Sequence, residues 1–176
     1  MNYLECITKY YPNVFVTCQG DVNTYADIQW AAGDPIPTQA ELDIKIFTYL
    51  KSAKIEELSE ACQADIMAGF NSMALGTLHR YDSHEEDQLN LIGTVTKTAP
   101  TPAALDGTSY LYASREIING VEQPKTYLMH THAQLRQVLD DGATYKLMEL
   151  VKFNTKKMEV LAMTTVAELD TVIWVD

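Results

Sequence analysis

The longest unbroken pattern of hydrophobic and polar positions lies between Gln39 and Met67, a stretch without glycine or proline. Its apolar residues recur at close to a helical interval, as on one face of an amphipathic helix. They are Ile44, Phe47, Leu50, Ile55, Leu58, Cys62 and Ile66. The pattern predicts one long helix, and the skip around Lys51–Lys54 argues against a strict heptad coiled coil.

Both ends of this helix carry signals. The breaker cluster at 33–37 holds two prolines, and the residue before a proline is pushed away from helical geometry. Thr38 and Glu41 have the spacing of a capping box, in which each side chain bonds to the other residue's backbone N–H. Gly69 follows the last apolar position and is expected to end the helix.

Residues 1–37 have the character of a small β module. A short β-branched and aromatic run at 14–16 precedes a polar turn at 20–23, and large apolar residues return within 25–30. One hairpin is predicted. Two strands alone cannot bury a face, so this module needs a further partner for stability.

After the helix, polar and apolar residues alternate at 73–81 and again at 89–95, with the acidic segment 82–87 between them. This alternation predicts two strands joined by an acidic turn. Asn119-Gly120 is a strong two-residue hairpin signal. Further strands are expected at 110–113, 115–118, 121–123 and 126–129.

The last third of the chain is predicted to be mainly helical. Thr131 is expected to cap a helix that Gly142 closes, and a second helix is expected at 143–154. Thr165 and Glu168 form a second capping-box pattern, which opens a short helix before a terminal strand. The expected ranges are 133–139 for the first of these helices, 172–175 for the terminal strand and 97–109 for an exposed loop.

Together these elements predict an α+β fold in three parts. Residues 1–37 form the N-terminal β module, 38–70 a long connecting helix, and 71–176 a compact domain of antiparallel hairpins followed by helices. A chain of 176 residues is long enough to bury a core without metal or disulfide support.

Charge then narrows the range of partners. The chain has 13 Lys and Arg against 24 Asp and Glu, a net charge of −11. Such a balance disfavours nucleic acid and anionic membranes, both of which attract clustered basic residues. No apolar run has the roughly 20 residues of a membrane span, and the N-terminus lacks a secretory signal pattern. Neither nucleic acid nor membrane is expected as a partner.

Candidate chemistry is sparse in the sequence. Cys6, Cys18 and Cys62 include no C-x-x-C pair, and each is interpreted as a small buried hydrophobe in a reducing cytoplasm. His130 and His132 have the spacing of strand-borne metal ligands, yet a third ligand is required. They lie where a strand passes into a capped helix, so their rings are expected to diverge and packing roles are favoured.

No other pattern indicates catalysis. The acidic segment 82–87 lacks the glycine and the ligand register of an EF-hand loop, so a solvated turn is favoured. Motifs for phosphate, dinucleotide, nucleophilic-serine and zinc-peptidase chemistry are absent from the sequence. A basic helical face is interpreted as a solvated surface or an intra-protein contact. Its members are Lys146, Lys152, Lys156 and Lys157. The sequence predicts neither enzyme activity nor a cofactor.

Several blocks carry a family resemblance. In order they are Ala68-Gly69-Phe70, Leu75-Gly76-Thr77, Tyr81-Asp82, the run from Asp87 to Gly93, the run from His130 to Gly142, and the run from Thr165 to Asp170. On these blocks, residues from about 54 to 176 resemble the DUF4376 family of bacteriophage and prophage proteins. One departure is Tyr127, where that family suggests tryptophan. The segments 9–13 and 37–42, with Trp30, resemble XkdW-type proteins encoded beside tail-fibre genes in prophages.

The resemblance implies a phage tail protein, made in the bacterial host cytoplasm and located in the virion. It would attach to the fibre or baseplate and act through protein–protein contacts without catalysis. An alternative is a tail-fibre assembly chaperone that is not retained in the virion. A remote alternative is a small metal-dependent hydrolase that uses His130 and His132.

The long helix supplies the expected contact with partners. Its first half is interpreted as a stalk that pairs with copies of itself, and its second half as a helix packed on its own domain. Small phage structural proteins are often homo-oligomers, so self-association is expected together with binding to fibre or baseplate proteins. The predicted partner-binding residues are Ile44, Phe47, Leu50, Leu58 and Cys62.

Overall fold

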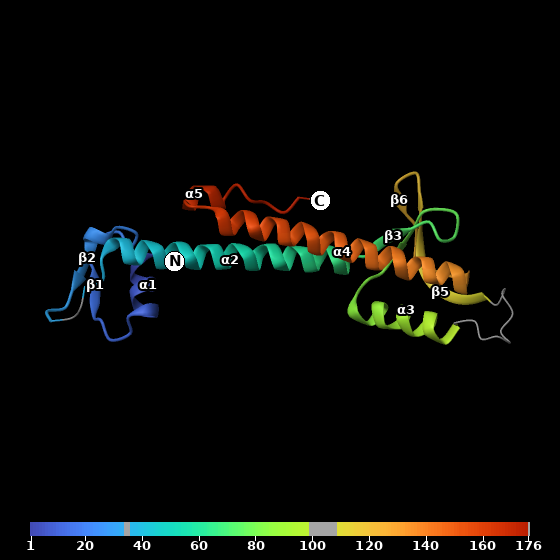
Figure 1. Ribbon diagram of the computed structural model, residues 1–176, viewed down its shortest axis with the longest axis horizontal. Helices are drawn as coiled ribbons and strands as arrows, with labels where there is room; N and C mark the ends of the chain where they lie inside the picture. The colour runs from blue at the N-terminus through green and yellow to red at the C-terminus, as the bar shows by residue number, and fades with distance from the viewer. Residues whose placement is uncertain (34–35, 99–108, 176) are drawn as a thin grey trace. The chain divides into compact units, whose positions relative to one another are not determined.

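The computed structural model describes residues 1–33, 36–98 and 109–175, and it has the predicted α+β fold (Figure 1). The chain forms two compact units, here called unit 1 and unit 2. Unit 1 comprises Met1–Leu58 with Lys156–Asp176, and unit 2 comprises Ser59–Thr155. The division falls inside both long helices, α2 (Gln39–Ala68) and α4 (His132–Ala162), and so differs from the three segments expected from the sequence.

Unit 1 begins with a helix that the sequence analysis missed, α1 (Tyr3–Tyr10). Its signal was local, because Asn2 and Glu5 form a capping box with both reciprocal hydrogen bonds present. The predicted hairpin follows, with β1 (Val16–Cys18) antiparallel to β2 (Ile28–Trp30). A short 3-10 helix, η1 (Tyr25–Asp27), leads into β2.

The core of unit 1 joins α1 and the hairpin to the first turns of α2. Its buried members are Tyr3, Cys6, Ile7, Ile28 and Leu42. Thr38 and Glu41 form the predicted capping box at the start of α2, where the Thr38 N–H donates to Glu41 Oε2 at 2.7 Å. The hairpin therefore has the packing partner that two strands require. Asp34 and Pro35 of the predicted breaker cluster lie outside the described residues.

The end of the chain also belongs to unit 1. Lys51 Nζ on α2 donates to the Leu161 carbonyl on α4 at 2.9 Å. Thr165 and Glu168 form the predicted capping box of α5 (Val166–Leu169). The terminal strand predicted at 172–175 is wrong, because these residues have no regular structure and no strand partner within the described chain.

In unit 2, Gly69 ends α2 as predicted and turns the chain into a sheet. Its φ of +105° lies in the region that favours glycine, and a Cβ here would stand 2.5 Å from the Tyr81 carbonyl oxygen. β3 (Phe70–Ser72) then pairs antiparallel with β4 (His79–Tyr81). The strand predicted over 73–81 is thus only its last three residues, since a turn at Gly76 occupies the rest.

The strand predicted at 89–95 is wrong, because this segment is part of α3 (Glu85–Thr98). Leu91 and Val95 are one helical turn apart and both are buried, whereas Leu89 is exposed. The acidic residues of 82–87 mostly belong to the first turn of this helix, where negative charge stabilises a helix N-terminus.

The second hairpin of unit 2 forms as predicted. β5 (Ser109–Ile118) turns at Asn119 and Gly120, with φ values of +52° and +78°, into β6 (Val121–Glu122). β7 (Thr126–Thr131) also pairs antiparallel with β5, and β5 pairs with β4 through its second half. Residues 99–108 of the predicted loop lie outside the described residues, and 97–98 belong to α3.

The predicted break at Gly142 is wrong, because α4 continues through it. A Cβ at Gly142 would lie 2.7 Å from Phe70 Cζ, so the glycine admits the Phe70 ring instead of ending the helix. The core of unit 2 gathers there, with Phe70, Tyr81, Leu91, Val95, Leu135 and Val138 among its buried residues. No helix within residues 1–33, 36–98 and 109–175 combines the length and apolarity needed to cross a membrane.

Candidate functional site

Two of the predicted partner-binding residues line an open groove in unit 1. Ile44 is 66% exposed, and it lines a groove of about 380 Å³ together with Phe47 and Val166. Lys51 Nζ lies 4.7 Å from the centre of the Phe47 ring, a cation–π distance. The helices α2 and α5 thus both contribute apolar side chains to this groove.

The other three predicted residues are less accessible. Leu50 is half-buried, Leu58 is fully buried, and Cys62 is 3% exposed. In unit 2 the Cys62 thiol donates to the Glu149 carbonyl at 3.5 Å, and burial raises the pKa of this thiol. Leu58 and Cys62 therefore contribute to the interior of the chain and leave almost no area for another chain to cover.

A second apolar surface lies on α4 in unit 2, and we call it the outer apolar face. It consists of Leu147, Met148, Leu150 and Val151, which are 61%, 63%, 45% and 57% exposed. These residues fall in the helix predicted at 143–154, for which no partner contact was expected. Spacing alone could not show which side of a helix with two apolar stripes faces the core.

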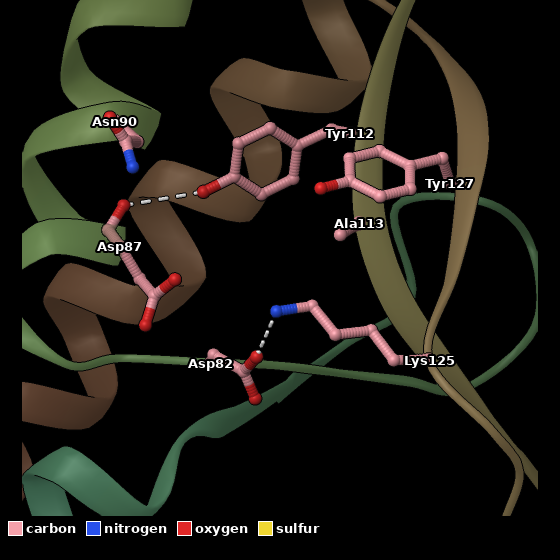
Figure 2. Close-up of a pocket in the computed structure, with 7 residues that line it drawn as sticks. All are labelled: Asp82, Asp87, Asn90, Tyr112, Ala113, Lys125 and Tyr127. Carbon is pink, nitrogen blue, oxygen red and sulfur yellow. Dashed lines mark hydrogen bonds and ion pairs between the residues drawn. The ribbon is translucent and has the colours of Figure 1, made fainter.

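A polar pocket of about 190 Å³ also lies in unit 2, between α3, the segment after β4, and strands β5 and β7 (Figure 2). Its lining comes from distant parts of the chain: Asp82, Asp87, Asn90, Tyr112, Ala113, Lys125 and Tyr127. Ala113 and Tyr127 are cross-strand partners in the β5–β7 pair.

Ion pairs fix one wall of the polar pocket. Lys125 Nζ lies 2.6 Å from Asp82 Oδ2, and Arg115 pairs with the other oxygen of the same carboxylate. Partial burial raises the pKa of Asp82, but hydrogen bonds from Arg115 and Lys125 outweigh it and hold the pKa below its usual range. The same hydrogen bond raises the pKa of Lys125. The Asp82 carboxylate is therefore ionised near pH 7, and the positive charges of Arg115 and Lys125 compensate its charge.

Tyr112 connects the polar pocket to the core. Its hydroxyl donates to the Asp87 carbonyl at 3.3 Å, and its ring stacks on Tyr81 with centroids 6.4 Å apart. Burial, reinforced by the charges of Asp87 and Asp82, raises the pKa of Tyr112 to about 12. The phenol therefore stays protonated, able to donate one hydrogen bond and accept others.

His130 and His132, the candidate metal ligands of the sequence, lie in different environments. His130 is fully buried; its Nε2 lies 2.9 Å from the Tyr81 hydroxyl and its Nδ1 lies 2.9 Å from the Leu128 carbonyl. Burial lowers the pKa of His130. His132, two residues later, is the half-buried first residue of α4. Across the described residues, no three His, Cys, Asp or Glu side chains gather as metal ligands.

Three of the four lysines of the predicted basic face, Lys146, Lys152 and Lys156, make contacts within the protein. Lys146 Nζ donates to Gln88 on α3, and Lys152 pairs with Asp65 on α2 and with Glu149. In unit 1, Lys156 pairs with Glu159. For these three lysines, the contacts favour the second of the two interpretations, an intra-protein contact, over a solvated surface.

No protein-family model, curated protein or solved structure shows a significant match to this chain.

Proposed function

We propose that this chain is a structural component of a bacteriophage tail, associated with the fibre or baseplate, and that it acts through protein–protein contacts. The observation that carries the proposal is the outer apolar face of α4. Its four large side chains form one contiguous stretch of a helix, and clustered exposed apolar residues mark interaction sites on soluble proteins. The tail context comes from the family resemblance, and the apolar face supplies a physical means of assembly.

The partner at this face is a second copy of the chain. Along the part of α4 that belongs to unit 2, Leu147, Val151 and Asn154 follow the alternating four- and three-residue intervals of a heptad repeat, and all three are exposed. Identical helices can pair through such a seam. Asn154 holds a seam position, where asparagine specifies register and oligomeric state because it bonds to its counterpart.

The groove at Ile44 and Phe47 supports binding to a different tail protein. It is open, and its walls combine apolar side chains with the threonines Thr164 and Thr165. Such a groove suits a single protruding apolar side chain with polar atoms beside it. The contribution of Ile44, Phe47 and Leu50 to partner binding stays a prediction.

Light scattering tests the assembly directly. We expect the wild-type chain to exceed the monomer mass, and the variant L147D/V151D to be monomeric with unchanged circular dichroism. The matched control is L89D/I92D, which adds the same charge at exposed apolar positions of α3. A monomeric wild type, or a mass that L147D/V151D leaves unchanged, would contradict self-association through α4.

Mass spectrometry of purified phage particles tests the tail assignment. The particles are those of the phage or prophage whose genome encodes the chain, and a structural component is present in them at stoichiometric level. A chain found in the infected-cell lysate but absent from finished particles would instead be an assembly chaperone, since the same apolar face would then be covered only during assembly.

A further inference from the structure

The polar pocket of unit 2 carries an inference that does not depend on the tail assignment. Three of its lining groups make no side-chain hydrogen bond or ion pair with any other described residue: the Asp87 carboxylate, the Asn90 amide and the Tyr127 hydroxyl. Figure 2 shows the Asp87 carboxylate and the Lys125 ammonium directed into the same space. The pocket thus presents hydrogen-bonding groups that a ligand can use.

An aromatic surface lies beside these groups. Tyr127 is 71% exposed, although tyrosine rings usually bury their faces against neighbours. Its cross-strand partner on β5 is Ala113, whose methyl group is too small to cover a ring. In Figure 2 the Tyr127 ring crosses in front of β5 at Ala113. The ring is therefore available for stacking from the pocket side.

The charges of the pocket discriminate among ligand classes. Asp87 disfavours an anion, because its carboxylate forms no close ion pair with any described residue, whereas the nearby Lys125 is already paired with Asp82. Lys125 projects its ammonium into the same space and disfavours a second cation, since like charges at short range repel. A neutral ligand with several hydroxyl groups is repelled by neither Asp87 nor Lys125.

We propose that the polar pocket binds one ring of a neutral sugar. A pyranose offers an apolar C–H face for the Tyr127 ring and a rim of hydroxyls for the polar side chains. Asp87 accepts from hydroxyls, while Asn90 both donates and accepts. Tyr112 contributes its phenol oxygen from the back of the pocket, where a pKa of about 12 keeps it protonated. A cavity of about 190 Å³ is suited to a single ring, with the rest of a longer saccharide outside it.

Saturation-transfer NMR on the full chain tests the proposal. The probes are methyl glycosides of neutral hexoses and of N-acetylhexosamines. We expect saturation of the ring C–H protons of at least one of them. The variant Y127A should weaken binding about tenfold, the effect of losing one aromatic contact, and Y127F should largely retain it. A113L places a larger side chain under the ring and should abolish binding.

Controls separate the site from a general loss of structure. Y10A removes a partly exposed tyrosine of unit 1 and should leave binding unchanged. Circular dichroism should show that Y127A and A113L remain folded. Absence of saturation for every glycoside, or equal binding by Y127A and wild type, would overturn the proposal. Binding of methylammonium or inorganic phosphate at Asp87 and Lys125 in place of the glycosides would also overturn it.

Discussion

In unit 2, α4 has two apolar faces made of similar residues, one buried in the core and the other exposed to solvent. On the inner face, Leu135 and Val138 are fully buried against Phe70, Tyr81 and Leu91. On the outer apolar face, Leu147 and Val151 are more than half exposed. One helix therefore supplies both a completed core and a surface of the same chemistry that still faces water.

Burial of apolar side chains on one helix can therefore drive two separate processes, folding of the chain and association between chains. Full burial of a leucine or valine side chain contributes about 1.5–3 kcal/mol. Burial of the inner face stabilises the folded unit 2. The outer apolar face is still exposed, so its burial would stabilise an association with another chain. Substitutions on the two faces should consequently affect different measurements.

The largest effect is expected on the inner face. Leu135→Ala removes a fully buried side chain and leaves a cavity, so we expect a loss of about 2–5 kcal/mol in the free energy of unfolding. Urea unfolding followed by circular dichroism measures it. The variant Leu147→Ala is the matched control on the outer face. Equal losses for the two variants would mean that both faces are part of the folded core.

A second prediction concerns the close approach of Phe70 to the inner face. Gly142→Ala places a Cβ 2.7 Å from Phe70 Cζ, and Phe70 is 4% exposed and cannot move aside freely. We expect a loss of about 1–3 kcal/mol from overpacking, partly offset by the roughly 1 kcal/mol gain in helix propensity.

Rescue provides the check on that mechanism. Phe70→Leu shortens the facing side chain, so adding it to Gly142→Ala should cost less than the sum of the two single substitutions in urea unfolding. Additive losses would place the cost elsewhere than at the Gly142–Phe70 contact.

The sequence predicted those elements whose signals are local. The capping boxes at Thr38 and Thr165 and the turn at Asn119-Gly120 all form in the structure. Each of these signals needs only neighbouring residues, because a cap or a tight turn satisfies its own backbone groups. The α+β class followed from them.

The errors arose where distant residues decide the outcome. Gly142 is expected to end a helix when read alone, but Phe70, far away in the chain, occupies the space that the glycine leaves. The segment 89–95 alternates in polarity, yet burial of Leu91 and Val95 favours a helix. The polar pocket could not be predicted either, because its lining residues come from separate segments with no shared motif.

A smaller effect is expected from the buried histidine beside the core that the inner face covers. His130 has a pKa below its ordinary value of 6.5, so the unfolded chain binds a proton more readily than the folded one. Its contribution to stability is complete above about pH 6.5 and is lost as the pH falls toward the folded-state pKa. The free energy of unfolding should therefore fall between pH 7 and pH 5.

Substitution identifies the group responsible. His130→Gln should flatten this pH dependence. Asp82 does not interfere, because its lowered pKa places its own loss of stability at more acidic pH. An unchanged slope in His130→Gln would assign the pH dependence to other groups.

The smallest effect on stability is expected on the outer apolar face. Leu147→Gln keeps the length and helix propensity of the side chain, so the free energy of unfolding at low protein concentration should change by less than about 0.5 kcal/mol. The same substitution should raise the concentration at which copies associate in sedimentation experiments, because the seam loses one apolar contact. A large stability loss without any change in association would assign Leu147 to the core of the single chain. Leu147 and Leu135 would then differ only in how exposed they are, and the outer apolar face would have no separate part in association.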